Sequence, residues 1–161
     1  MRFILVDRIL ELEPGKHIRA EKRVAPDEDY FRDHFPGFPV VPGVLLTEMM
    51  AQTAGKCLDA ENPARGKAML ARIKNASFRE WVRPGQLCII TATVLTSRAQ
   101  FATMESFVAV DEKKVCSAEM FFSFAAMNLL APGYRDEVLE AFQETRRAGL
   151  PVTGAVANKQ S

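Results

Sequence analysis

Residues 31–52 read F-R-D-H-F-P-G-F-P-V-V-P-G-V-L-L-T-E-M-M-A-Q, a loop rich in proline and glycine followed by an apolar run. The loop half contains Pro36, Gly37, Pro39, Pro42 and Gly43. Each proline fixes its own φ angle, and each glycine permits a tight turn or a close approach to a ligand. The sequence therefore predicts that His34 sits on a rigid loop.

The apolar half of the segment predicts a buried helix from about Gly43 to Leu58. Only Thr47, Glu48 and Gln52 interrupt its apolar side chains in the quoted stretch, so the helix is apolar almost all round and belongs in a core. Proline and glycine stand where a capping Ser, Thr, Asp or Asn is usual. The first helical N–H groups are therefore expected to be free to bind an oxygen of a ligand.

Glu48 and His34 form the candidate catalytic pair. Glu48 lies one helical turn from apolar residues on both sides, where a carboxyl is poorly solvated and its protonated form is favoured. A protonated carboxyl suits a general acid, and Gln52, one turn further on, can orient it by a hydrogen bond. His34 suits the base role because imidazole titrates near neutrality. A lone histidine in such a loop is commonly a packed or solvent-facing residue, but the pair in this setting indicates acid/base catalysis.

These residues resemble the 3-hydroxyacyl-[acyl-carrier-protein] dehydratases of bacterial type II fatty acid synthesis, specifically the FabZ type. The signature of that family is a His-Phe-Pro-Gly loop, then Pro-Gly, then a helix that carries Glu and Ala-Gln. The chain matches it with His34–Gly37, Pro42–Gly43, Glu48 and Ala51–Gln52. The opening F-I-L-V-D-R-I-L-E-L-E-P-G-K and the later V-R-P-G-Q extend the resemblance over roughly residues 1–126.

The resemblance implies an α+β hot-dog fold, in which an antiparallel sheet wraps one long central helix. It also implies a homodimer whose active sites lie at the interface, with His34 from one protomer and Glu48 from the other. Assembly of such dimers into a trimer of dimers remains open. The chain is expected to be cytoplasmic and to bind neither nucleic acid nor a membrane.

The implied reaction is dehydration of (3R)-hydroxyacyl-[acyl-carrier-protein] to the trans-2-enoyl product, with His34 as base and Glu48 as acid. The partner is an acyl carrier protein that bears the substrate on phosphopantetheine. No metal or organic cofactor is expected. The expected substrate-binding residues are Phe35, Pro36, Gly43, Val44 and Gln52.

Three related functions remain as alternatives: a dehydratase/isomerase, a thioesterase and a non-catalytic acyl-carrier binding subunit. The isomerase family carries aspartate at the position of Glu48, and hot-dog thioesterases use a helix carboxylate without the His-Phe-Pro-Gly loop. A binding subunit is expected to have lost His34 or Glu48, and both are present.

The chain departs from the family pattern at two places. Asp33 stands where the family commonly has glycine, and it either perturbs His34 or points to solvent. A tail follows the last expected strand, and its helix either covers the mouth of the acyl tunnel or extends the dimer contact.

Composition agrees with a single globular domain. With 161 residues and 48% hydrophobic content, the chain can bury one substantial core, and a net charge of +1 argues against bulk binding of nucleic acid. Cys57, Cys88 and Cys116 are far apart in apolar surroundings, so buried thiols in a reducing compartment are expected. The apolar run Phe3–Val6 is too short for a signal peptide or a membrane span.

The expected elements are a hot-dog domain over residues 1–131, an appended helix within 132–150 and a disordered tail over 151–161. A first strand is predicted near residues 2–12, and a second strand follows it and ends at about residue 25. The core helix is followed by a polar loop that begins at Asp59. Four later β runs, separated by short turns, predict an antiparallel meander near residues 67–78, 86–98, 101–110 and 115–126. The appended helix is predicted over Tyr134–Arg147, with an apolar stripe of Tyr134, Val138, Leu139 and Phe142.

The segment from Ala64 to Arg83 is strongly basic and has two interpretations. It is either a docking patch for an acidic acyl carrier protein or a solvated strand face with its loops. Its basic residues are Arg65, Lys67, Arg72, Lys74, Arg79 and Arg83.

Overall fold

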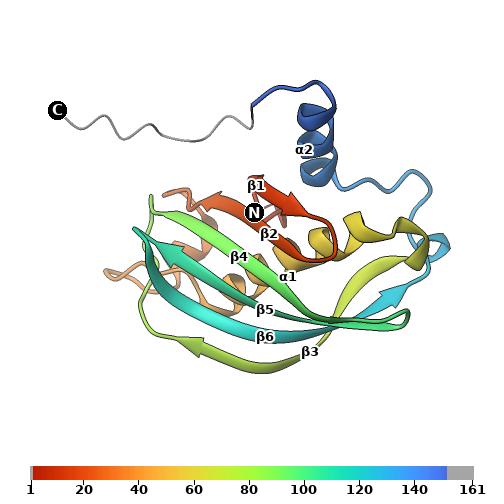
Figure 1. Ribbon diagram of the computed structural model, residues 1–161. Helices are drawn as coiled ribbons and strands as arrows, with labels where there is room; N and C mark the ends of the chain where they lie inside the picture. The colour runs from red at the N-terminus through yellow and green to blue at the C-terminus, as the bar shows by residue number, and fades with distance from the viewer. Residues whose placement is uncertain (1, 152–161) are drawn as a thin grey trace.

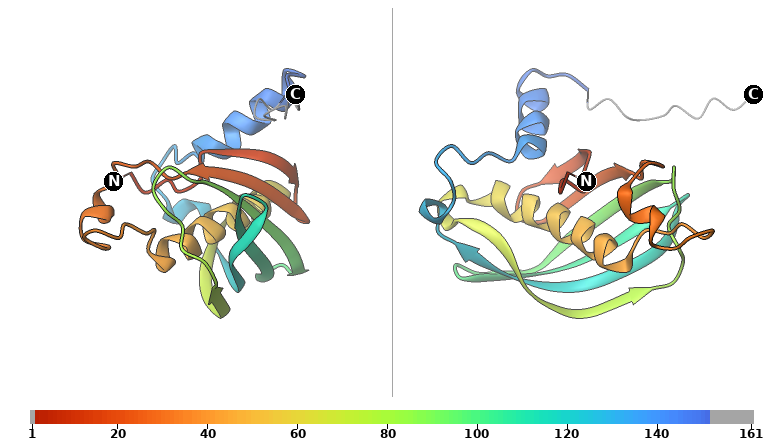
Figure 2. Two further views of the ribbon diagram at one scale, coloured as in Figure 1. Left: turned by 90° about the vertical axis from the view of Figure 1, so that its left-hand side faces the viewer. Right: turned by 180° about the vertical axis from the view of Figure 1, so that it is seen from behind.

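The computed structural model describes residues 2–151. In this part of the chain, six strands form one antiparallel sheet, and the long helix α1 lies along its concave face (Figures 1 and 2). The elements are β1 Arg8–Glu13, β2 His17–Arg23, α1 Gly43–Glu61, β3 Lys67–Phe78, β4 Leu87–Ser97, β5 Phe101–Val110, β6 Lys113–Ala125 and α2 Glu137–Arg147. Short 3₁₀ turns cover Asp29–Arg32, Pro63–Arg65 and Met127–Leu129.

The strand order in the sheet is β1-β2-β4-β5-β6-β3. The predicted meander is confirmed for β4, β5 and β6, but β3 pairs with β6 instead of β4 and forms an edge. The connection after β3 carries the chain across the sheet. Arg79 N donates to Val115 O in β6 at 2.8 Å, whereas Gln86 O accepts from Val24 N beside β2 at 2.9 Å.

The core lies between α1 and the sheet. Of the 19 residues of α1, 11 are buried, in agreement with its apolar pattern, and the helix packs against alternate residues of the strands. The largest fully buried side chains of α1 and the central strands are Ile18, Met49, Met50, Leu58, Ile90, Met104, Met120 and Phe122. Fully burying one such side chain stabilises the fold by about 1.5–3 kcal/mol.

The predicted end of the core helix at Leu58 is wrong, because α1 continues to Glu61. Asp59 is in the last turn of the helix, and its Oδ1 accepts a hydrogen bond from the N–H of Ala68 in β3 at 2.8 Å. The hydrogen bond holds the Asp59 side chain against the sheet, so this polar residue is accommodated within the helix and does not end it.

The predicted start of the first strand is also wrong, because β1 begins at Arg8 and not near residue 2. The preceding residues lie over α1, where Leu5 N donates to Oε1 of Gln52 at 2.9 Å. Leu5 and Val6 are buried there. The apolar run at the N-terminus therefore covers the helix instead of extending the sheet.

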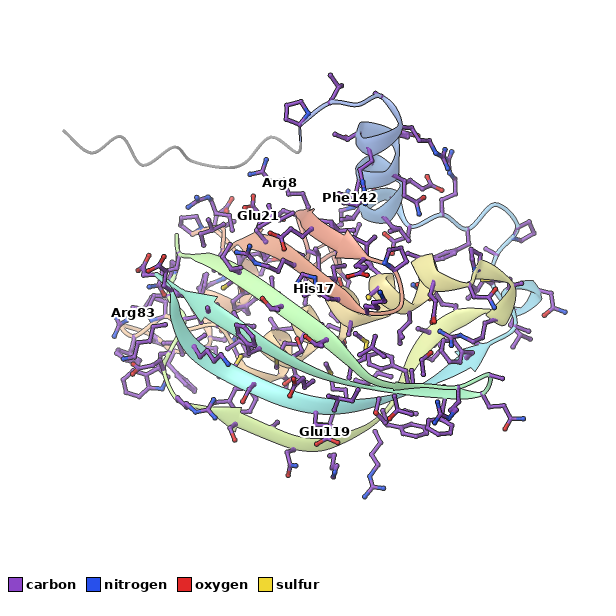
Figure 3. The ribbon with its side chains drawn as sticks, viewed as in Figure 1. Arg8, His17, Glu21, Arg83, Glu119 and Phe142 are labelled. Carbon is purple, nitrogen blue, oxygen red and sulfur yellow. The ribbon has the colours of Figure 1, made fainter. Side chains whose placement is uncertain are left out.

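Helix α2 begins at Glu137, later than the predicted Tyr134. Asp136 is its N-cap and accepts from Leu139 N at 3.0 Å, so the helix starts at the capping residue. Val138, Leu139 and Phe142 are buried as predicted, and Phe142 lies on the side of α2 that faces β1 (Figure 3). Tyr134 is 43% exposed and precedes the helix. Apart from Pro151, the tail predicted to be disordered lies outside the described residues.

All three cysteines are free and buried. Burial raises the pKa of the Cys57 and Cys116 thiols to about 11 and that of Cys88 to about 12. These thiols are therefore core residues without nucleophilic character near neutral pH. Among the described helices, none has the length and apolarity needed to cross a membrane.

Candidate active site

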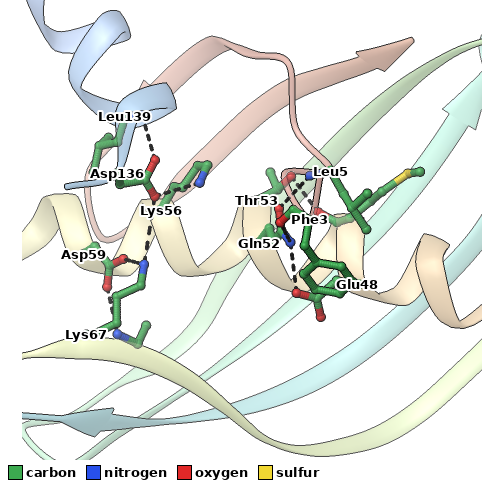
Figure 4. A network of polar contacts seen from close by, with 12 residues as sticks. Phe3, Leu5, Glu48, Gln52, Thr53, Lys56, Asp59, Lys67, Asp136 and Leu139 are labelled. Carbon is green, nitrogen blue, oxygen red and sulfur yellow. Dashed lines mark hydrogen bonds and ion pairs between the residues drawn. The ribbon is translucent and has the colours of Figure 1, made fainter. Parts of the chain in front are cut away.

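Glu48 lies on α1 beside Gln52, at the spacing that the helix predicts. Gln52 Nε2 donates to Glu48 Oε1 at 3.0 Å and also approaches Phe3 O at 3.3 Å, while Gln52 Oε1 accepts from Leu5 N at 2.9 Å. The N-terminal segment thus fixes the amide of Gln52, and the amide in turn fixes one carboxyl oxygen of Glu48 (Figure 4). The second oxygen, Oε2, remains available for proton transfer. The contribution of Phe3 and Leu5 was not predicted from the sequence, because both residues act through their backbone groups.

His34 is held in its loop by Val40. Its Nδ1 lies 3.1 Å from Val40 O, and Val40 N donates to His34 O at 3.0 Å. A carbonyl oxygen only accepts, so Nδ1 carries a proton in this arrangement and Nε2 presents its lone pair. The ring of His34 stacks on Phe35 with 4.0 Å between ring centroids, and the peptide bond between the two residues is cis. Asp33 is exposed, as the solvent-facing interpretation expected.

The loop of His34 is anchored beside the segment that follows β3. Val41 N donates to Val82 O at 2.8 Å, and Phe38 makes an edge contact with Trp81 at 5.1 Å between ring centroids. The Arg83 guanidinium lies 4.5 Å from the Phe38 ring. Arg83 is labelled at the left-hand end of the molecule in Figure 3. These contacts support the prediction of a well-held loop.

The start of α1 has no side-chain cap, as the sequence predicted. Leu45 N and Leu46 N both donate to Pro42 O, but the N–H groups of Gly43 and Val44 have no acceptor among residues 2–151. Val44 is 75% exposed, so these donors are open to a ligand. A Cβ added at Gly43 lies 3.1 Å from the Phe78 ring, so the glycine lets the helix start approach the end of β3.

A cleft of about 630 Å³ extends from Glu48 along one face of α1. The face consists of Glu48, Ala51, Gln52, Gly55 and Lys56. The first residues of β3 and the segments around Ile4 and Val138 complete the walls. Of the predicted site residues, this cleft brings together Glu48 and Gln52. It is not lined by His34, Phe35, Pro36, Gly43 or Val44.

Three charged side chains at the far end of the cleft, Lys56, Lys67 and Asp136, form a cluster with Asp59 that was not predicted from the sequence. Lys56 Nζ lies 2.7 Å from Asp136 Oδ2, and Lys67 contacts both Asp59 and Asp136 (Figure 4). All four side chains are largely buried. Burial acts to lower the pKa of Lys67, but the charge and hydrogen bond of Asp59, with the charges of Tyr134 and Asp136, outweigh it and raise the pKa above its ordinary value. The signal in the sequence was Lys56, a charged residue on a helix that is apolar almost all round.

Two members of the predicted basic patch are engaged inside the protomer. Arg65 Nη2 pairs with Glu61 at 2.7 Å, its guanidinium lies 3.9 Å from the Phe124 ring, and Lys67 belongs to the charged cluster. Both side chains are therefore held inside the protomer and are not presented to a docking partner. Lys74 pairs with Glu119 at 3.1 Å on the exposed face of the sheet. Among the described residues, no group of three or more His, Cys, Asp or Glu side chains is placed to hold a metal ion.

Comparisons with known proteins give the family. The model of the FabA-like domain matches residues 1–119. A 3-hydroxyacyl-[acyl-carrier-protein] dehydratase FabZ from Pediococcus pentosaceus is 41% identical over 124 residues, which cover 76% of this chain and 83% of that protein. The protein of the same name from Lawsonia intracellularis is 41% identical over 120 residues, covering 72% and 78%.

Solved structures share the fold at low sequence identity. The Escherichia coli PaaI protein from the phenylacetic acid degradation operon aligns with a TM-score of 0.59 at 12% identity, covering 73% of this chain and 78% of that chain. The six-stranded antiparallel sheet around α1 agrees with this likeness. The chain therefore has the hot-dog fold and belongs to the FabA-like family, as a member of its FabZ type.

Proposed function

We propose that the chain catalyses the reversible loss of water from a (3R)-hydroxyacyl thioester of acyl carrier protein to give the trans-2-enoyl thioester, in fatty acid biosynthesis. The observation that carries this proposal is the oriented carboxyl of Glu48, held by Gln52 at 3.0 Å in a cleft suited to an acyl chain. The FabZ relatives, which are named for this reaction, support the same activity.

The mechanism follows from the groups that the site presents. The N–H groups of Gly43 and Val44 bind the thioester carbonyl oxygen and stabilise the enolate charge as it develops. His34 takes the proton from the α-carbon at Nε2. Glu48 gives a proton to the departing 3-hydroxyl, so the C–O bond breaks, the α,β double bond forms and water leaves. Gln52 is a positioning residue, and the exposed Phe35 and Pro36 contact the phosphopantetheine side of the substrate.

Each active site is proposed to combine two protomers. The edge strand β3 has no partner on its outer side among the described residues, and large apolar residues on it and after it are exposed. They are Met69, Leu70, Ile73, Phe78 and Trp81. A long apolar edge of this kind is suited to pairing with a second copy about a twofold axis. Pairing there sets His34 of one protomer opposite Glu48 of the other.

The thioester carrier is proposed to dock on the exposed basic residues near β3. Arg72, Lys74, Arg79 and Arg83 remain on the surface and suit an acidic carrier. The free, buried thiols support a reducing compartment such as the cytoplasm.

The proposed function is tested by hydration of a crotonyl thioester of acyl carrier protein, followed as loss of enoyl absorbance. Substrate consumption that yields the 3-hydroxy product is the expected result. Binding of the carrier thioester without turnover of short and long substrates contradicts the reaction and favours the binding-subunit alternative.

Sharing of the site between protomers makes a separate prediction about mixed dimers. Neither His34→Ala nor Glu48→Ala alone is active, but a heterodimer of the two carries one intact site. Random association is expected to restore about a quarter of the wild-type specific activity, because half of the dimers have one working site of two. Activity of co-expressed chains carrying different affinity tags measures this. Absence of any restoration in verified heterodimers contradicts the shared site, and sedimentation distinguishes a dimer from a trimer of dimers.

A further inference from the structure

The cleft beside Glu48 changes in character along its length. Near Glu48 its floor consists of small residues, because Ala51 and Gly55 follow on the same face of α1. A Cβ added at Gly55 lies 4.0 Å from Ala68 Cβ, which is an ordinary contact, so the absent side chain leaves space in the cleft. This part of the cleft suits an unbranched alkyl chain.

The far end of the cleft is polar. Lys56 and Lys67 lie there with Tyr134, Arg135 and Asp136 from the segment that leads into α2. The Lys56–Asp136 pair holds this segment against α1, with side chains 8% and 13% exposed. An alkyl end pushed against these groups would strip water from charges without replacing their hydrogen bonds, which is unfavourable.

The wall belongs to a part of the chain that the family match does not include. The matched region ends at residue 119, whereas Tyr134 and Asp136 come later. The apolar side chains of α2 pack on the body of the protein, with Val138 and Leu139 both less than a tenth exposed. The wall is thus fixed from both sides, by the ion pair and by the packing of α2.

We infer that the segment Tyr134–Val138, anchored through Lys56–Asp136, forms the end wall of the acyl cleft and excludes long acyl chains. This inference rests on the proposed dehydratase function and specifies its substrate class. The substrates are thioesters of short and medium straight-chain acids.

The distance from Glu48 to the wall sets the limit. Lys56 follows Glu48 by eight residues, which corresponds to about 12 Å along the axis of α1. In an extended zigzag alkyl chain, each C–C bond of about 1.5 Å adds somewhat less than its own length to the length of the chain. Roughly nine methylene groups therefore fit between the reacting carbon and the wall. Acyl chains beyond about twelve carbons therefore meet the wall.

The test is a chain-length profile of kcat/KM on carrier thioesters of four, eight, twelve and sixteen carbons. The wild type is expected to lose about tenfold or more between twelve and sixteen carbons, the scale of misfit in a fixed apolar pocket. Tyr134→Ala opens the wall and is expected to recover the sixteen-carbon substrate. Gly55→Leu fills the floor and is expected to lower activity on twelve carbons about tenfold. Thermal unfolding and sedimentation of each variant show whether it is folded and assembled like the wild type.

The control is Arg147→Ala, at the exposed end of α2 and outside the cleft. Its profile should equal that of the wild type. A wild-type profile that is flat to sixteen carbons, or variants whose profiles match it, overturns the end wall while leaving the dehydratase reaction intact. A wild type inactive at every chain length overturns the proposed function and this inference with it.

Discussion

His34→Ala and Glu48→Ala are each expected to lower kcat for hydration of the crotonyl thioester by about a thousandfold, within the range that general acid or base groups contribute. His34→Ala removes the group that takes the α-proton. Glu48→Ala removes the proton donor for the hydroxyl and leaves the Gln52 amide without its acceptor on this side chain. KM should change much less, because neither side chain provides most of the contact with the acyl chain.

Two matched variants separate chemistry from folding. His17→Ala removes the only other histidine, which lies part-exposed in β2 near Glu11, and Glu80→Gln changes an exposed carboxylate. Both should keep wild-type activity. Glu48→Gln tests the acid more finely, since it keeps the shape of the side chain but cannot give up a proton. A loss below about tenfold in His34→Ala or Glu48→Ala, with the controls active, contradicts the proposed roles.

The part of the site that local spacing sets was predictable from the sequence. Glu48 and Gln52 are four residues apart on one helix, and helical geometry alone brings their side chains together. The uncapped start of α1 was equally local, because Pro42 and Gly43 occupy the capping place. The buried face of β6 is also local in origin, because Cys116, Ala118, Met120 and Phe122 occupy alternate positions of the strand.

The errors concern contacts between distant parts of the chain. The run after Phe3 has the composition of a strand, yet it covers α1 because Gln52 offers both a donor and an acceptor to its backbone. The pairing of β3 with β6 could not be predicted from the sequence of either strand alone, because the β3 sequence is compatible with both a central strand and an edge strand. Tyr134 fitted a helical stripe, but the N-cap at Asp136 determines where α2 starts.

Lys56 shows how the cluster at the end of the cleft could have been found. A charged residue on a buried face of an apolar helix needs a partner, and that reasoning applied to Lys56 as it did to Glu48. Its partner Asp136 is 80 residues away, so the need for a partner could be predicted from the sequence, but the identity of the partner could not.

The second large effect is expected on stability. Asp136→Asn should lower the free energy of unfolding by about 3 kcal/mol, because it leaves the buried ammonium of Lys56 without its opposite charge. Asparagine still accepts a hydrogen bond from Leu139 N, so the cap of α2 is retained and the loss reports the ion pair. Urea unfolding of both proteins measures the difference, and hydrogen exchange of α2 amides shows whether the helix detaches first.

The control for this prediction is the double variant Lys56→Met, Asp136→Asn. Removing both charges should recover much of the loss, since no unpaired buried charge on Lys56 remains. Equal losses in the single and double variants contradict a coupled pair, as does a loss below about 0.5 kcal/mol in Asp136→Asn, the size expected for an exposed pair.

The same pair fixes how the difference depends on pH. Burial acts to raise the pKa of Asp136, but the charge and hydrogen bond of Lys56, with Leu139 N–H and the charge of Lys67, outweigh it and hold the pKa below its ordinary value of 3.8. A carboxylate with a lowered pKa in the folded state stabilises the fold above its unfolded pKa and loses that contribution as the pH falls through the folded value. The stability difference between wild type and Asp136→Asn should therefore be constant between about pH 5 and 8 and shrink below about pH 4. A difference that instead grows as the pH falls contradicts the assignment, because Asp136 would then have to be protonated more readily in the folded protein than in the unfolded chain.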